Sequence, residues 1–307
     1  MTSPKLLVTT IAVSLSLLSC SPRSGNTDTS SKQNSILQDE LSKITEGKPG
    51  QFGVAIIIDN TDTITFNNSA DYPLMSMFKL HEAIAVCHTL DTQTTELDST
   101  LTIKRSDLDP ETWSPMFKEH TQDHITMSIG ELLAYTLIHS DNNTSNLLFD
   151  RVVSTTDTDC YIRTILPEDD FQIRYTESEM KADHSKAYEN RSSPLSYAAL
   201  VNRVFTDSLV SRPKQEYIKQ MMYDCHTGAS RIAAGLPEGV KFAHRTGSGY
   251  TNSRGEVSAV NDSGYVTLPS GRHYSIAVFV KNFGGTQEDA EKITAEISKT
   301  VYNFVAN

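Results

Sequence analysis

Apolar residues follow a strand pattern near both ends of this chain. Residues 52–58 form a continuous apolar run rich in β-branched side chains, which predicts a buried strand, and residues 63–66 alternate like its hairpin partner. Three later segments are also strand-like: residues 241–246, 257–267 and 274–280. A turn containing proline, serine and glycine at positions 269–271 separates the last two and predicts a hairpin.

Helical spacing dominates the middle of the chain, from about residue 73 to residue 225. Apolar positions within residues 80–90 recur every three or four residues, which places Ser76 in the first turn of a buried helix. Ser128 and Glu131 form a capping-box pattern, and Ser193 precedes a proline that can open another helix. One more helix is predicted at each end, over residues 34–46 and over a last apolar stripe made of Ile293, Ile297, Val301 and Phe304.

Strand-rich ends around a helical middle predict an α+β fold. We expect residues 35–72 and 226–307 to build one α/β domain, an antiparallel sheet flanked by helices. Residues 73–225 would form an all-helical domain inserted into it. Ser76 would then lie at the junction of the two domains, where clefts form.

Composition and charge narrow the range of functions. The chain has 307 residues, 38% of them hydrophobic, which is enough for a sizeable core, and its formal net charge is −11. Nucleic acids and anionic membranes are bound by basic patches, and the sequence contains none. We therefore expect neither as a partner.

The N-terminus reads as a targeting segment. Residues 6–18 are almost all apolar or small and form a run too short to span a membrane comfortably. The run ends in L-L-S-C at Cys20, which resembles a bacterial lipoprotein signal over residues 1–20 with a lipidated cysteine; the alternative is a plain secretory peptide. Either predicts export. Residues 21–34 are polar and predict a flexible tether.

The cysteines and histidines do not suggest a metal centre. Only Cys87, Cys160 and Cys225 follow Cys20, and three cysteines cannot all pair with one another. Cys87 falls on the apolar face of its helix and is expected in the core. No Cys/His cluster has a convincing metal spacing, so we expect no metal and no cofactor, with His244 able to support a site from behind.

Ser76 and Lys79 are the first candidates for chemistry. They lie three residues apart, so their side chains share a helix face. In a partly dry site an ammonium can lose its proton and act as a base toward the hydroxyl, and a helix N-terminus offers N–H groups to an oxyanion. The alternative is a serine cap followed by a solvated lysine.

Three later stretches carry the other groups that a serine acylation site needs. S-D-N at Ser140 offers a hydroxyl and an amide, although it is also common turn chemistry. R-T-G-S-G at Arg245 ends a predicted strand with a cation and a hydroxyl suited to a carboxylate, unless it is only a glycine turn. Glu177 lies in a long polar stretch, residues 167–193, as a general base or as part of a solvated loop.

The order S-x-x-K, S-D-N and [K/R]-T-G, with a glutamate-bearing loop before the last motif, resembles class A serine β-lactamases. The motifs span residues 76–249 and the terminal elements fit too, so the resemblance covers essentially all of the mature chain. T-E-x-x-M at Glu177 and W-S-P at Trp113 resemble the branch with a longer omega loop, often cephalosporinases.

The resemblance implies a role for each residue. Ser76 would be the acylated nucleophile, Ser140 the relay of a proton to the lactam nitrogen, and Glu177 the base that activates the deacylating water. Lys79 would accept a proton in acylation, a step whose base is disputed between this lysine and the glutamate. The remaining implied roles are Asn142 for the substrate's side-chain amide, Arg245 and Thr246 for its carboxylate, the N–H groups of Ser76 and Ser248 for the oxyanion, Trp113 at the cleft mouth, and Asn146 as an anchor of the omega loop.

Three positions depart from the family's pattern. Arg245 stands where lysine is usual; it keeps the charge, so we expect it to serve binding more than chemistry. Lys181 stands four residues after Glu177, where an asparagine often holds the same water. Tyr175 stands where an arginine often pins the loop, so we expect a different internal packing there.

The resemblance thus predicts an exported, lipid-anchored, periplasmic serine β-lactamase that acts as a monomer on a β-lactam substrate. Two alternatives stay open. A penicillin-binding D,D-peptidase would lack an equivalent of Glu177, and a non-catalytic binding protein of the same fold would have no need to keep every chemical position filled.

Overall fold

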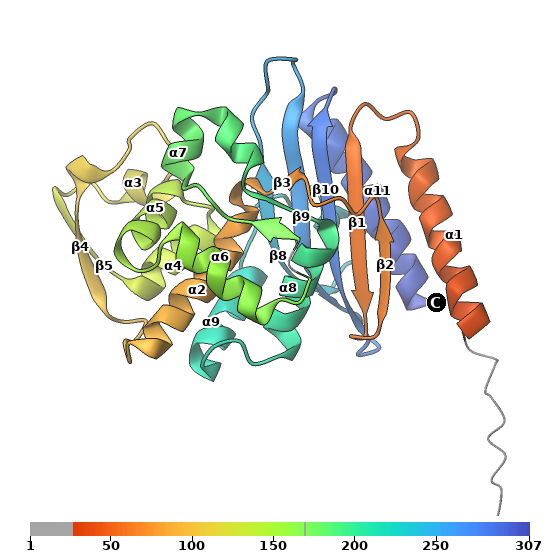
Figure 1. Cartoon of the computed structure of the whole chain (residues 1–307), viewed down its shortest axis with the longest axis horizontal. Coiled ribbons are helices and arrows are strands. Elements are labelled where there is room, and N and C mark those ends of the chain that lie inside the picture. Colours follow the sequence, from red (N-terminus) through yellow and green to blue (C-terminus); the bar gives the residue numbers. More distant parts are fainter. Residues whose placement is uncertain (1–26, 169) are drawn as a thin grey trace, which may run out of the picture.

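The computed structural model describes residues 27–168 and 170–307, with side chains from residue 34 onward. Figure 1 shows an antiparallel sheet beside a mainly helical part. The five strands of the sheet lie in the order β2-β1-β10-β9-β8, and their bounds are Gln51–Ile58 for β1, Asp62–Phe66 for β2, Lys241–Ser248 for β8, Val257–Thr267 for β9 and His273–Phe283 for β10. The predicted fold class and the predicted β9–β10 hairpin are confirmed.

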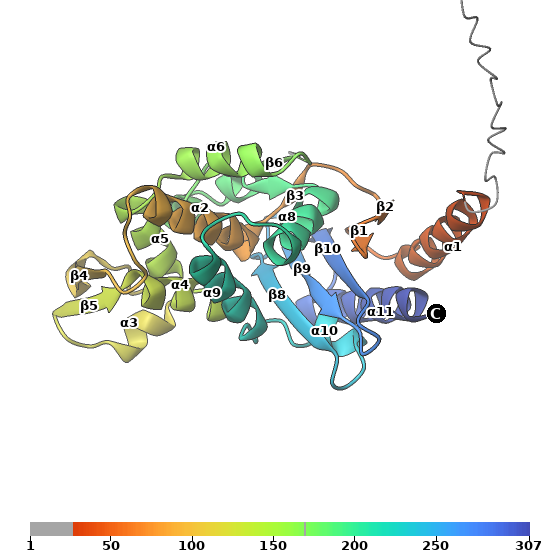
Figure 2. The ribbon, with the colours of Figure 1, turned by 90° about the horizontal axis from the view of Figure 1, so that it is seen from below.

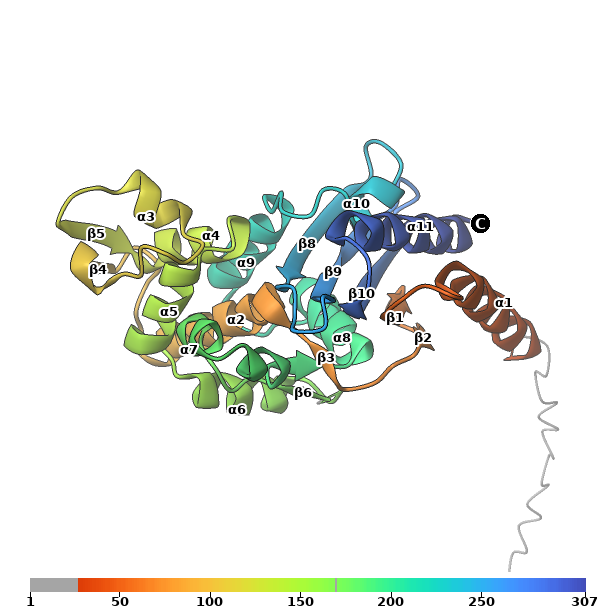
Figure 3. The same ribbon diagram turned by 90° about the horizontal axis from the view of Figure 1, so that it is seen from above.

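Strand alternation divides the interior into two cores. In β1, Val54 and Ile56 join the core that contains residues of α1 (Thr27–Thr45) and α11 (Gln287–Ala306), whereas Ala55 joins the core on the other face. That second face is covered by α8 (Pro194–Thr206), which contacts β1, β9 and β10. Figures 2 and 3 show α8 and α11 on opposite sides of the sheet.

The helical part is built around α2 (Lys79–Thr92), which contacts α4, α5, α6 and α9. Even the polar residues His81 and Glu82 are fully buried, because neighbouring elements cover α2 on nearly every side. The remaining helices are α3 Pro115–Glu119, α4 Ile129–Ile138, α5 Asn142–Arg151, α6 Thr155–Ile165, α7 Glu177–Ala182, α9 Arg212–Tyr223 and α10 Ile232–Gly235.

Two predicted boundaries need correction. α1 begins at Thr27, inside the stretch predicted as a tether, because residues 27–33 contain no glycine or proline to stop a helix that the apolar stripe holds in place. The middle of the chain is not all helical. It includes the strand pair β4 (Thr100–Lys104) and β5 (His124–Ser128). It also includes β6 (Phe171–Gln172) and β7 (Arg191–Ser192), and β7 pairs with both β6 and β3 (Tyr72–Pro73).

The predicted signal over residues 1–20, with Cys20, lies outside the described residues, as does the first part of the predicted tether. Within residues 27–168 and 170–307, no helix is both long and apolar enough to cross a membrane.

Three short 3₁₀ segments complete the described chain path: η1 Met75–Phe78, η2 Arg105–Asp107 and η3 His184–Tyr188.

Candidate active site

A cavity of about 780 Å³ opens where the sheet meets the helical part. Its walls come from η1, the loop before α3, the turn between α4 and α5, and the end of β8. The remaining wall is the long polar loop of residues 167–193, called the omega loop below, which contains α7. Seven of the predicted site residues line it: Ser76, Trp113, Ser140, Asn142, Glu177, Thr246 and Ser248. Lys79 and Arg245 are fully buried. The fold thus assembles motifs that lie up to 170 residues apart in the sequence.

Lys79 is the hub of the hydrogen bonds beneath the cavity. Its Nζ lies 3.1 Å from Ser76 Oγ, 2.9 Å from Glu177 Oε1 and 2.6 Å from Asn142 Oδ1. The same ammonium donates to the carbonyl of Ser140 at 2.9 Å. Ser76 Oγ in turn donates to Glu177 Oε1 at 3.0 Å, so the nucleophile touches two groups that can accept its proton.

Burial dominates the electrostatics of this hub. Burial lowers the pKa of the Lys79 ammonium, while the adjacent Glu177 carboxylate acts in the opposite direction. One turn further along α2, burial raises the pKa of the Glu82 carboxyl well above its ordinary value. Glu82 accepts a hydrogen bond from Ser145 at 2.7 Å and thereby joins α2 to α5.

Two residues that line the cavity have strained backbones. Met75 and Ser140 have φ values of 49° and 59°, in the left-handed region that residues other than glycine rarely adopt, at a cost on the order of 1–3 kcal/mol each. Nearby, a Cβ on Gly247 would come within 2.4 Å of the Leu74 carbonyl, so only glycine lets β8 lie this close to η1. The surrounding contacts hold Ser76 and Ser140 at the cavity.

Arg245 is surrounded by backbone carbonyls and the Ser140 hydroxyl. Its guanidinium is fully buried and has no surface in the cavity, because the long side chain runs beneath η1. It donates to the carbonyls of Ser76 at 3.1 Å and Leu137 at 3.2 Å, and to Ser140 Oγ at 2.8 Å. The contact of Arg245 with a substrate carboxylate stays a prediction, and in this structure the guanidinium reaches the cavity through Ser140.

The S-D-N turn is fixed to the loop that carries Trp113. Asp141 is fully buried, caps α5 through the N–H of Thr144, and accepts hydrogen bonds from Ser114. The Trp113 indole donates to the carbonyl of His139 at 2.9 Å and is 57% exposed at the cavity's edge. The ring lines the cavity and has Lys118 Nζ 5.1 Å from its centroid, and its contact with a substrate stays a prediction.

The omega loop has its own internal anchor. Asn190, which is fully buried, accepts hydrogen bonds from the N–H groups of Arg174 and Tyr175 and donates to the Tyr175 carbonyl. Nothing in the sequence marked Asn190, because a lone asparagine in a polar loop carries no pattern. Asn146 bonds Ser178 through both its amide nitrogen and its oxygen, as an omega-loop anchor would.

Two further polar residues, Thr227 at the cavity and Arg231 buried behind it, have no signal in the sequence. Thr227 Oγ1 lies 2.6 Å from Thr246 Oγ1, which doubles the hydroxyls available at this wall. Arg231 is buried and donates to Ser248 Oγ at 2.5 Å and to the carbonyl of Asn261 at 2.7 Å. Their local sequence lacks periodicity and motif, so only the tertiary structure reveals them.

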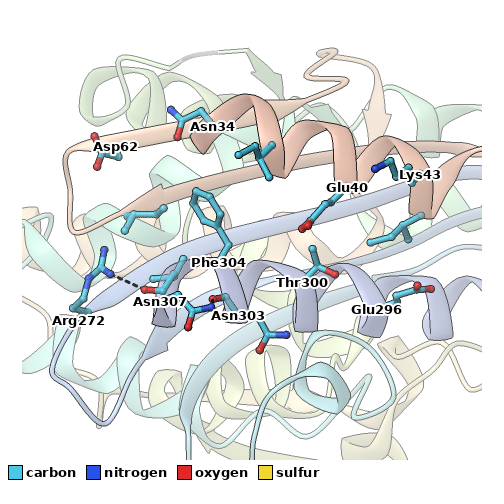
Figure 4. A pocket seen from close by; sticks show the side chains of 14 residues that line it. Asn34, Glu40, Lys43, Asp62, Arg272, Glu296, Thr300, Asn303, Phe304 and Asn307 are labelled. Atoms are coloured by element: carbon cyan, nitrogen blue, oxygen red, sulfur yellow. Dashed lines mark hydrogen bonds between the residues drawn. The ribbon is translucent and has the colours of Figure 1, made fainter. Parts of the chain in front are cut away.

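A second cavity, of about 870 Å³, lies between α1 and α11 (Figure 4). Arg272 at its edge donates to the carbonyl of Val305, and polar side chains such as Asn34 and Asn303 line it. It contains none of the predicted site residues. Within residues 27–168 and 170–307, no group of three or more His, Cys, Asp or Glu side chains is arranged to hold a metal ion.

Comparison with known proteins decides the family. The model of the β-lactamase enzyme family matches residues 36–305, a range that includes every residue lining the cavity around Ser76. The chain belongs to the β-lactamase family. A β-lactamase of Phocaeicola vulgatus is 47% identical over 272 residues, covering 88% of this chain and 85% of that protein.

Solved structures place this β-lactamase in class A. The extended-spectrum β-lactamase TLA-1 superimposes with a TM-score of 0.87 at 32% identity, over 90% of this chain and 100% of that one. A class A β-lactamase of Bacteroides cellulosilyticus gives a TM-score of 0.84 at 32% identity, over 89% and 98% of the two chains. The protein is therefore a hydrolase of β-lactams, an activity that confers antibiotic resistance.

Proposed function

We propose that this β-lactamase works through an acyl-enzyme on Ser76. Ser76 Oγ attacks the lactam carbonyl carbon, an ester forms, and the C–N bond of the ring breaks. The hydroxyl proton has two acceptors within 3.1 Å, Glu177 and Lys79. Burial lowers the pKa of Lys79 and so makes loss of its proton easier, and the N–H groups of Ser76 and Ser248 would stabilise the oxyanion.

Ser140 would deliver a proton to the leaving nitrogen. Arg245 already donates to Ser140 Oγ, so the hydroxyl's own hydrogen is left to point toward the lactam nitrogen. Lys79 Nζ lies 3.5 Å from the same oxygen, close enough to resupply the proton after transfer. Ser140 thus links the base of the first step to the leaving group.

Glu177 would activate the water that hydrolyses the ester. The observation that carries this proposal is the contact of a single carboxylate oxygen, Glu177 Oε1, with both Ser76 Oγ and Lys79 Nζ. A base so close to the acylated oxygen gives the enzyme a route to release its product. A D,D-peptidase that is acylated but releases β-lactams slowly would lack this group.

The test is to trap the ester. Glu177→Gln removes the base and should still be acylated, because Ser76 and Lys79 remain. Losing a general base typically costs roughly 10²–10⁴-fold in the step it serves, so the variant should accumulate an adduct of protein plus cephalosporin, seen by mass spectrometry. Ser76→Ala should give no adduct, and EDTA should leave wild-type nitrocefin turnover unchanged.

Glu179 provides the matched control. Its carboxylate caps α7 by accepting hydrogen bonds from the Thr176 N–H and hydroxyl, and it points away from Ser76. Glu179→Gln keeps an acceptor for this cap and should turn over nearly as the wild type does. Wild-type hydrolysis by Glu177→Gln would end the deacylation role.

We propose cephalosporins as a substrate class and a monomer as the active form. The T-E-x-x-M and W-S-P motifs support the first, as does the likeness to TLA-1, which is named as an extended-spectrum enzyme. We also propose that the protein is exported to the periplasm as a lipoprotein. The apolar run ending at Cys20 supports this proposal.

A further inference from the structure

Glu177 and Lys181 lie on the same face of α7, four residues apart. In that order and at that spacing, a glutamate and a lysine on a helix normally attract each other. Such a pair would put a second cation on the proposed base, which already contacts Lys79 at 2.9 Å. The structure does not form it.

Lys181 instead reaches across the cavity rim to Asp109. Its Nζ lies 2.6 Å from Asp109 Oδ2, and this pairing holds the pKa of the Asp109 carboxyl below its ordinary value. Asp109 is firmly held: its N–H donates to Asn143 Oδ1 at 3.0 Å, and Asn143 Nδ2 donates back to its carbonyl at 3.0 Å. Asn143 is itself 3% exposed, so this anchor belongs to the interior.

We propose that Asp109 is a positioning residue that keeps Lys181 away from Glu177. It does so by offering Lys181 a fixed carboxylate on the opposite rim, where the lysine cannot compete for the base. The inference rests on the proposed role of Glu177 in deacylation. It explains how the chain tolerates a lysine where the family often has an asparagine.

The consequence concerns the strength of the base. A carboxylate paired with two ammonium groups holds its negative charge more tightly and accepts a proton from water less readily. Acylation should be affected less, because Lys79 is also within reach of Ser76. A release of Lys181 should therefore slow ester hydrolysis specifically.

A double-mutant cycle tests this with the purified enzyme and a cephalosporin. Asp109→Asn keeps an oxygen for the Glu111 N–H, which donates to Asp109 Oδ1 at 2.8 Å, but loses the charge. We expect Asp109→Asn to slow deacylation about three- to tenfold, less than the roughly 10²–10⁴-fold cost of removing a general base. Pre-steady-state mass spectrometry separates this rate from acylation.

The matched variants decide between mechanisms. In a Lys181→Gln background, Asp109→Asn should leave the deacylation rate at that of Lys181→Gln alone. In the wild-type background, Asp109→Glu keeps the carboxylate and should retain the wild-type deacylation rate. Equal slowing by Asp109→Asn in both backgrounds would mean a loop defect and would overturn the inference. If Asp109→Asn slows deacylation in neither background while Glu177→Gln still traps its ester, this inference is overturned and the proposed function stands. Wild-type turnover by Glu177→Gln overturns the proposed function as well.

Discussion

At the scale of single residues, buried donors set the direction of the exposed reactive groups. Ser140 has a strained backbone, its carbonyl is held by Lys79, and its hydroxyl is held by Arg245. Both cations are fully buried, so water does not weaken these bonds. The position of the Ser140 proton therefore depends on two cations buried beneath the cavity.

Arg245→Ala should lower kcat rather than mainly raise KM. The guanidinium acts through Ser140, and its loss also leaves the carbonyls of Ser76 and Leu137 without a donor, at a cost on the order of 1–3 kcal/mol in the free energy of unfolding for each. Steady-state kinetics and urea unfolding measure the two effects. Arg245→Lys should keep more activity than Arg245→Ala, because it retains a charge.

A Ser140→Ala background gives the control for this effect. There, Arg245→Ala should change kcat little, because the group it acts through is gone. A rise in KM with unchanged kcat for the single variant would instead support direct contact with the substrate.

The sequence predicted which residues come together at the cavity better than it predicted their contacts. Ser76, Lys79, Ser140 and Glu177 follow from motif spacing, because each motif is short and local. The path of the Arg245 side chain does not follow from motif spacing, since it depends on how β8 packs against η1. Asn190 has no local signal at all, because its partners matter only once the loop is folded.

At the scale of elements, strands β8 and β9 carry a buried ion pair behind the site. His244 Nδ1 lies 2.9 Å from Asp262 Oδ1, and His244 Nε2 lies 3.0 Å from the carbonyl of Cys225. The segment after Cys225 carries Thr227, whose hydroxyl bonds Thr246. This arrangement ties the strands to the cavity wall, as a histidine supporting the site from behind would.

This pair should make stability fall at alkaline pH. Burial acts to lower the pKa of His244, but Asp262 outweighs burial and raises that pKa to about 10. Protonated His244 therefore stabilises the folded state fully below about pH 6.5, its unfolded value, and this contribution is lost as the pH rises toward 10. Between pH 7 and pH 10, the free energy of unfolding should fall in the wild type by at least about 1.4 kcal/mol more than in His244→Gln.

Denaturant unfolding across that pH range measures the difference. His124→Gln is the matched control, because His124 is an exposed histidine on β5. It should keep the wild-type pH profile. Parallel profiles for the wild type and His244→Gln would show that the pair does not titrate in this window.

At the scale of the whole molecule, the sheet separates two cores and the site lies at the edge of one. The core between the sheet, α1 and α11 joins both ends of the chain, while the other core joins the sheet to α2 and α8. Ser76 lies in η1, which follows β3 at the point where the chain passes from the sheet to the helical part. The catalytic geometry therefore depends on both ends of the chain being folded.

The sequence predicted this plan from periodicity, because long strands and amphipathic helices leave a clear pattern. It missed the strand pair β4 and β5, and it missed β3, β6 and β7, which are two residues long and too short to alternate. The predicted start of α1, residue 34, was also too late. Polar residues such as those at 27–33 adopt a helical conformation only when a neighbouring apolar stripe supports it.

Outside the described residues, the chain should carry a lipid on Cys20. The apolar run of residues 6–18 is too short for a comfortable membrane span and is followed by S-C, whose cysteine would be lipidated and become the mature N-terminus. Lipid would hold the folded domain at a membrane, since each buried CH₂ contributes about 0.8 kcal/mol. In the natural bacterial host, wild-type protein should fractionate with membranes and incorporate labelled fatty acid. Cys20→Ala should lose both the label and the membrane fraction, while Cys160→Ala, a change at an exposed cysteine of the folded domain, should lose neither. A wild-type protein that is fully soluble and begins at another residue would show that the segment is a plain secretory signal.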